Sequence, residues 1–252
     1  PDILSFTDQA AALRNLADLS IMAKKYQDAI GYYNKWLDFT GELDPNVEMR
    51  IANCFYEMKQ FNKVIAPADR AIAHFKEPKK EPYIMKYASY YELKQTKKVI
   101  EVLEEAVVIF PKEKTFWVQL GNFYSADEQF AKALAVIDMA YKQGYLTTEN
   151  EIKLLANLYN NNNVPYKAAA TLEKHLKSGL VKKDRAILMS IASSYNSARE
   201  FEKAAAFFGQ AAQLSSEGDI YRRQGNAYLM ANKNADAVTA LKKALELGVK
   251  DK

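Results

Sequence analysis

Glycine and proline are scarce in this sequence. Its 252 residues include only 9 Gly and 7 Pro, which leaves little material for the turns that join the short strands of a β-rich protein. The chain is instead rich in Ala, Leu, Lys and Glu, which favour helix. Apolar residues make up 49% of the sequence, enough for a large buried core. These totals predict an all-α protein.

Residues that commonly hold metals or attack substrates are equally few. Cys54 is the single cysteine, and the two histidines are His74 and His175. An intramolecular disulfide is therefore excluded, and no cluster of His, Cys and acidic residues has the spacing of a zinc site. The sequence also lacks a P-loop, G-x-S-x-G and H-E-x-x-H. We expect Cys54 to be a core residue and His175 a packed or half-exposed ring, with no catalytic residue, metal or cofactor in a protein that is not an enzyme.

Long apolar runs and a strong excess of one charge are missing too. No run approaches the roughly 20 apolar residues that cross a bilayer, so we expect no transmembrane segment. The formal charge is only +4, and the basic pairs are scattered among acidic residues, which favours solvated helix faces over nucleic-acid binding. The chain opens PDILSFTDQA, without an initiating Met or a signal sequence, and is interpreted as an excised fragment or a processed protein.

An internal repeat organises the chain. The segment MKQFNKVIAPADRAI (58–72) matches LKQTKKVIEVLEEAV (93–107) at an offset of 93 − 58 = 35 residues. A cleaner copy is WVQLGNFY (117–124), followed by Ala133, Ile137 and Ala140. The arrangement W-x₂-L-G-x₂-Y followed by A-x₃-apolar resembles the tetratricopeptide-repeat family. The small residue that opens the second helix of each unit recurs every 33–36 residues: Ala29, Val64, Val99, Ala133, Ala168, Ala204 and Ala237.

The resemblance implies a right-handed α-solenoid of about seven helix–turn–helix repeats in one domain over 1–252. Small residues at the helix crossings are expected to let the paired backbones approach closely. The chain stops at LELGVKDK, without a polar capping helix, so we expect the natural protein to continue with more repeats. The expected repeats are, approximately, 10–43, 45–78, 80–113, 114–147, 149–183, 185–217 and 218–251.

Four consecutive asparagines, Asn160–Asn163, interrupt the fifth repeat before Pro165. Asparagine tolerates the left-handed backbone of helix ends, and proline suits the first turn of a helix. We interpret the run as the turn between a helix that ends at Tyr159 and one that starts at Pro165. Asp44-Pro45 is likewise expected to be an N-cap followed by a first-turn proline, and Thr148-x-x-Glu151 a capping box.

One position of the first helix points to a binding groove, because in this family the first helices line the concave face. Two residues before the tyrosine-type position the repeats hold Asp18, Asn53, Ala88, Asn122, Asn157, Ser193 and Asn226. Asparagine is a poor mid-helix residue, so its recurrence invites a reason. A ladder of amides can hold an extended peptide backbone without reading its sequence. The alternative is that asparagine is common at this position in unliganded repeats.

Basic side chains could add preference for an acidic ligand. A carboxylate clamp, as in some relatives, would use Lys153, Asn157 and Arg223, but Ser190 and Asp219 occupy its other two positions. An acidic ligand could still be favoured by Arg222, Arg223, Lys153 and Arg50. Partner-specific anchors could be Met22, Tyr56, Tyr91, Met189 and Met230, for which core packing is the preferred interpretation. The predicted groove residues are Asn53, Asn122, Asn157, Asn226, Lys153, Arg222 and Arg223.

A second resemblance covers approximately residues 110–250. The pieces AYKQGYLT, LLANLY and VPYKAAATLEKHLKSG resemble tetratricopeptide proteins encoded with TonB–ExbB–ExbD clusters in marine and related γ-proteobacteria. The resemblance implies export to the periplasm and a partner such as TonB, ExbB or ExbD. We therefore expect an interaction scaffold, a periplasmic adaptor of that system. The alternative is a general peptide-binding or chaperone-like module that holds an extended ligand.

Overall fold

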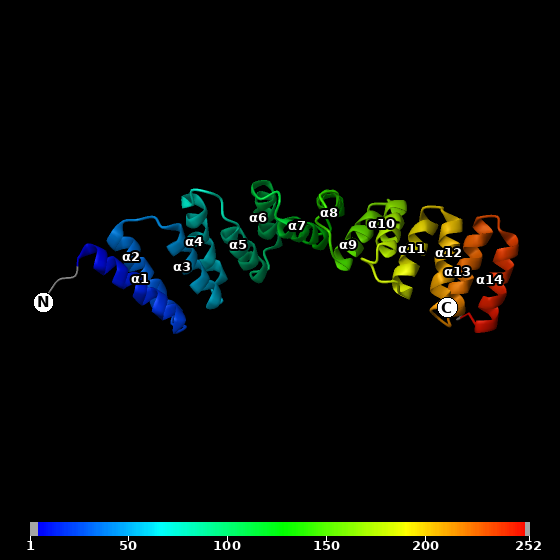
Figure 1. The fold of residues 1–252 in the computed structure, drawn as a ribbon, viewed down its shortest axis with the longest axis horizontal. Helices are drawn as coiled ribbons and strands as arrows, with labels where there is room; N and C mark the ends of the chain where they lie inside the picture. Colours follow the sequence, from blue (N-terminus) through cyan, green and yellow to red (C-terminus); the bar gives the residue numbers. More distant parts are fainter. Residues whose placement is uncertain (1–4, 250–252) are drawn as a thin grey trace. The chain divides into compact units, whose positions relative to one another are not determined.

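The computed structural model of the protein describes residues 5–249, and this part of the chain contains 14 α-helices and no strand. The helices form seven consecutive pairs (Figure 1). The predicted all-α architecture of seven helix pairs is therefore confirmed. The pairs are α1 (Phe6–Met22) with α2 (Tyr26–Thr40), α3 (Pro45–Glu57) with α4 (Phe61–His74), α5 (Lys80–Glu92) with α6 (Thr96–Ile109), α7 (Lys114–Ala126) with α8 (Phe130–Lys142), α9 (Glu149–Asn161) with α10 (Pro165–Lys177), α11 (Arg185–Ser197) with α12 (Phe201–Gln213), and α13 (Gly218–Met230) with α14 (Asn234–Leu247).

The helices belong to two compact units. The first unit ends at Phe123 and the second begins at Tyr124, so the boundary falls within α7. In the first unit each helix from α1 to α5 packs on the helix that follows it, and in the second each helix from α8 to α13 does so. Within residues 5–249, extensive packing joins helices that are neighbours in sequence, as expected for stacked repeats.

A residue with left-handed backbone lies in the turn of every helix pair. The φ angles of these non-glycine residues lie between 56° and 60°. In the fifth pair, the Val164 N–H after this residue donates to the carbonyl of Tyr159 at 2.8 Å, a bond that closes a Schellman-type helix end. The turn residues are Lys24, Lys59, Lys94, Glu128, Asn163, Arg199 and Asn232.

The asparagine run is only partly the turn that the sequence predicted. Helix α9 continues to Asn161, so Asn160 is helical and only Asn163 has the left-handed backbone, at φ 58°. The Asn160 side chain donates to the Ser194 hydroxyl of α11 at 3.0 Å, and Asn162 donates to the Phe130 carbonyl of α8 at 3.0 Å. The run thus combines a helix end with bonds to both neighbouring repeats. The predicted caps at Asp44 and Thr148 are both confirmed.

Asn163→Ala should lower the free energy of unfolding by about 1 kcal/mol. The Cβ atom of any L residue is strained in the left-handed region, and alanine lacks the polar side chain with which asparagine can offset that strain by a local hydrogen bond. Asn161→Ala, at an exposed helical position two residues earlier, should change it by only a few tenths of a kcal/mol. Urea unfolding followed by circular dichroism measures both. Equal effects of the two substitutions would contradict the role given to Asn163.

The core follows the helix crossings. All seven small residues that open the second helices are fully buried, at 0% exposure. On the facing helix Gly225 has no room for a side chain, because a Cβ there would lie 2.6 Å from the Leu241 Cγ. The first helix of each pair is therefore held at a fixed depth against the second, and its opposite side is left for solvent or a ligand.

Ala204→Leu should cost about 1–3 kcal/mol of stability, because three extra carbons must enter the fully buried crossing of α11 and α12. The matched control is Ala206→Leu on the exposed side of α12, where the leucine meets solvent. Thermal unfolding should separate the two variants clearly. A well-tolerated Ala204→Leu would mean that the crossing is looser than the structure indicates.

Candidate peptide-binding groove

The predicted asparagines all lie on first helices and are all exposed. Asn53 (α3) and Asn122 (α7) belong to the first unit, and Asn157 (α9) and Asn226 (α13) to the second. Within residues 5–249 none of the four amides has a hydrogen-bond partner. Each unit therefore offers two open amides on alternate repeats, with Ala88 or Ser193 at the position between them.

The basic residues of the predicted groove are already paired with carboxylates. Arg222 and Arg223 both donate to Asp219, Nε to Oδ1 at 3.0 Å and Nε to Oδ2 at 3.1 Å. The Arg222 and Arg223 hydrogen bonds outweigh partial burial and hold the pKa of Asp219 below its ordinary value. Lys153 pairs with Glu149. Asp219 is thus an internal counter-ion for the two arginines.

A polar groove crosses the second unit. Between α11, α12 and α13 lies a pocket of about 390 Å³ that includes Ser193, Ser197 and Asn226. Between α9, α10 and α11 lies another of about 400 Å³, which shares Ser193 and Ser197. Hydroxyl and amide groups both donate and accept hydrogen bonds. This surface can therefore bond to the N–H and C=O groups of an extended peptide.

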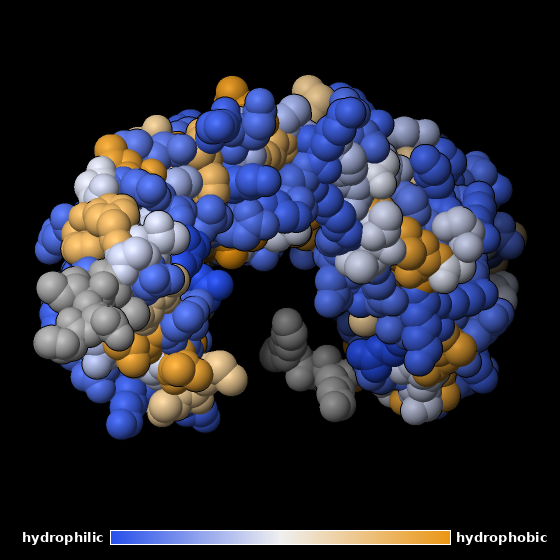
Figure 2. Space-filling model, turned by 60° about the vertical axis from the view of Figure 1, so that its left-hand side comes forward, coloured by the Kyte–Doolittle hydropathy of each residue, from blue (hydrophilic) through white to orange (hydrophobic). Residues whose placement is uncertain are grey.

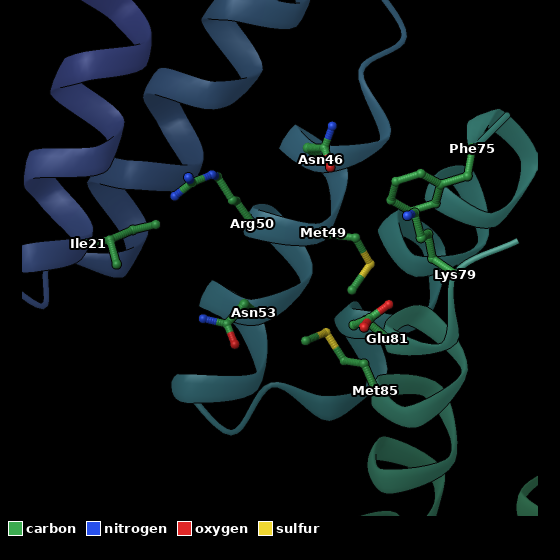
Figure 3. A pocket seen from close by; sticks show the side chains of 9 residues that line it. All are labelled: Ile21, Asn46, Met49, Arg50, Asn53, Phe75, Lys79, Glu81 and Met85. Atoms are coloured by element: carbon green, nitrogen blue, oxygen red, sulfur yellow. The ribbon is translucent and has the colours of Figure 1, made fainter. Parts of the chain in front are cut away.

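The first unit holds a pocket of different chemistry, about 550 Å³ in volume (Figure 3). Asn53 is the one predicted groove residue in its wall. Sequence analysis missed the apolar part, although Met49 lies one helical turn before Asn53 and so shares its face. Phe75 and Lys79 come from the segment between α4 and α5. The repeat pattern in the sequence does not show where this connecting segment lies in the fold. The lining residues are Ile21, Asn46, Met49, Arg50, Asn53, Phe75, Lys79, Glu81 and Met85.

Tyrosine–carboxylate hydrogen bonds fix the ends of the first helices. The Tyr159 hydroxyl donates to Asp138 of the preceding helix, and the Tyr195 hydroxyl donates to Glu173 in the same way one repeat later. Burial raises the pKa of Glu173, but hydrogen bonds from Lys177 and Tyr195 outweigh it and hold that pKa below its ordinary value.

A lysine covers each of these rings from the following second helix. The ammonium lies over the ring centroid eight residues earlier, at 5.6 Å for Lys167 over Tyr159 and 5.2 Å for Lys203 over Tyr195. The same contact joins Lys132 to Tyr124 at 5.3 Å. These cation–π contacts place a positive charge beside each tyrosine ring.

Tyr195→Phe should lower the free energy of unfolding by about 1–2 kcal/mol at pH 7, because Glu173 loses a bond to its charged form. The folded pKa of Glu173 lies below its ordinary 4.5, so its contribution is present above pH 4.5 and is lost as the pH falls through the folded value. The difference between the variant and the parent should shrink in that range, as urea unfolding from pH 7 to pH 3 can show. The control is Tyr221→Phe, whose hydroxyl has no hydrogen-bond partner in the described residues. A difference that does not change with pH would contradict the bond.

Several apolar side chains expected in the core are exposed instead. Met22, Tyr91 and Met230 are 79%, 60% and 62% exposed, so their interpretation as core residues was wrong. Each lies at the last turn of a first helix, and Tyr91 also contacts Phe123 of α7 edge to face, with the ring centroids 5.8 Å apart. Figure 2 shows the visible surface as mainly hydrophilic, with apolar residues in small separate patches. These three side chains remain available as contacts.

The side chains that could ligate a metal ion or act as a nucleophile are dispersed. Among residues 5–249 no three His, Cys, Asp or Glu side chains gather as a metal site would require. Cys54 is fully buried, and burial raises the pKa of its thiol to about 11. His175 is half-buried and its Nε2 lies 3.0 Å from the Tyr141 hydroxyl. Within the same residues no helix is long and apolar enough to cross a membrane.

No protein-family model and no curated protein matches this sequence, but solved structures match the fold. The C-terminal part of a tetratricopeptide-repeat protein from Cytophaga hutchinsonii is 16% identical with a TM-score of 0.54, covering 94% of this chain and 95% of that one. YrrB, a tetratricopeptide-repeat protein with an unusual peptide-binding site, is 17% identical with a TM-score of 0.55, covering 71% and 91%. The TPR2AB domain of yeast Sti1, in a complex with pHSP90, is 17% identical with a TM-score of 0.51, covering 96% and 91%.

The chain thus has the fold of the tetratricopeptide-repeat proteins. At these identities the likeness establishes the architecture, and function has to be argued from the surface of the two units.

Proposed function

We propose that this protein is a non-enzymatic scaffold that binds an extended segment of a partner protein along its first helices. The observation that carries the proposal is the set of four exposed, unpartnered amides at one position of the repeat. An exposed mid-helix asparagine costs several tenths of a kcal/mol relative to alanine. An amide that hydrogen-bonds a ligand backbone offsets that cost when the partner is bound.

Two further observations support a peptide ligand. The hydroxyl and amide lining of the groove in the second unit suits main-chain groups, which every peptide offers. YrrB has a peptide-binding site, and the yeast Sti1 domain is in a complex with pHSP90, on the same fold. The same lining favours, as a second candidate, a chaperone-like module that holds many unfolded segments. A specific scaffold should capture a few partners, and a chaperone-like module should capture many.

The sequence resemblance over residues 110–250 suggests which partner to seek first. On that resemblance we propose a periplasmic adaptor whose ligand is TonB, ExbB or ExbD. The proposal rests on the quoted sequence pieces alone. It is tested separately from peptide binding, because the fold can bind a peptide in any compartment.

The test is affinity capture from solubilised γ-proteobacterial envelope with the chain as bait, followed by mass spectrometry. A variant with Asn53, Asn122, Asn157 and Asn226 changed to Ala should lose captured partners about tenfold, because several backbone hydrogen bonds are lost together. The matched control changes four other exposed asparagines to Ala: Asn34, Asn62, Asn161 and Asn234.

The outcomes separate the parts of the proposal. Partners that bind the parent and the control but not the groove variant support the groove. Partners that bind all three baits equally would move the interaction to another surface. Capture of other proteins without TonB, ExbB or ExbD would refute the adaptor proposal and leave the scaffold.

A further inference from the structure

The pocket of the first unit brings together four separate parts of the chain. Ile21 comes from α1, Met49, Arg50 and Asn53 from α3, and Met85 from α5, with Phe75 and Lys79 between α4 and α5. Figure 3 shows Met49 directed toward Phe75 and Lys79, with Met85 below them and Arg50 turned toward α1. Side chains from consecutive repeats thus converge on one cavity of about 550 Å³.

The centre of this pocket is apolar and adaptable. Met49, Phe75 and Met85 are half-buried, so part of each side chain still faces solvent. Methionine is unbranched and polarisable, which lets it fit apolar groups of different shape. A volume of this size is in the range of small-ligand sites. It is ample for one large apolar side chain, whose burial here would also cover the two methionines.

The rim is charged, and its cations are not equivalent. Arg50 is engaged by Asp18 of α1 at 3.0 Å, and Asp18 also accepts from the buried Tyr33 hydroxyl. Lys79, in contrast, is exposed and forms no ion pair with any residue from 5 to 249. It also stands at the N-terminal end of α5, where the helix dipole adds positive potential. Glu81 is the one carboxylate in the lining.

We propose that this pocket binds a peptide segment in which a large apolar side chain stands next to an acidic residue. The apolar side chain enters between Met49, Phe75 and Met85, and the acidic one pairs with Lys79. The Asn53 amide then bonds the peptide backbone. The inference rests on the proposed scaffold function and adds to it the chemistry that this subsite selects.

The test measures fluorescence anisotropy with labelled, end-blocked peptides of one Gly/Ser frame. Their central residues are Leu-Glu, Leu-Lys or Ser-Glu, so no free carboxyl terminus takes part. The Leu-Glu peptide should bind about tenfold more tightly than the Ser-Glu peptide, as burial of a leucine side chain predicts. It should bind about two- to fivefold more tightly than the Leu-Lys peptide, because a surface ion pair contributes little.

Charge reversal gives the sharper result. Lys79→Glu should make the Leu-Lys peptide the preferred ligand, and Glu81→Gln should strengthen binding of the Leu-Glu peptide. Lys76→Glu is the matched control, since Lys76 is exposed nearby and does not line the pocket. Circular dichroism should show that all three variants stay helical, as expected for exposed positions.

Each result bears on the pocket or on the scaffold. Reversal by Lys79→Glu but not by Lys76→Glu supports the pocket. Equal binding of the three peptides, or equal effects of the two lysine substitutions, overturns it. Peptide binding that responds only to Asn122, Asn157 and Asn226, which lie outside the pocket lining, overturns the pocket and leaves the scaffold function standing. Absence of binding to any peptide, with no partner captured from envelope, overturns both.

Discussion

The close approach of the two helices in each pair is the constraint on which the rest of the structure depends. It requires a side chain of at most a few atoms at the crossing, and the seven residues there are fully buried. Gly225 shows how little space remains, since any Cβ would meet Leu241. The small residues at the crossing fix the distance between the first helix and the second. The outward-facing positions of the first helix therefore recur with the same period as the repeat in the sequence. A periodic set of outward-facing side chains then follows from a periodic core.

The turn and the cap bonds preserve this register from pair to pair. Each turn uses one left-handed residue at the same phase of the repeat, and this residue is lysine or arginine in more of the turns than it is asparagine. The tyrosine–carboxylate bond, covered by a lysine, then joins a first helix to the helix before it. The left-handed turn residue thus helps to set the angle between the two helices of a pair. The tyrosine–carboxylate bond helps to hold each pair against the one before it.

The sequence was sufficient to predict the helices, their pairing, two caps and the exposed amides, because these depend on spacing within one repeat. It failed where contacts come from different repeats. The Met49–Phe75–Met85 pocket depends on how three repeats meet, and Asn160 was misplaced because its bond to Ser194 lies in the next pair. The pairing of Arg223 with Asp219 could have been predicted from their separation of four residues on one helix. Met22 and Tyr91 are exposed at the last turn of a first helix, and the spacing within one repeat does not reveal that exposure.

The buried Cys54 has a consequence for the conditions in which this fold can exist. Its Sγ lies inside the first unit, and a thiol with a pKa of about 11 is almost entirely protonated at neutral pH. Thiol–disulfide exchange needs an accessible thiolate. The folded chain therefore gains no covalent bond in an oxidising compartment and loses none in a reducing one. Its packing therefore depends on no disulfide, in either kind of compartment.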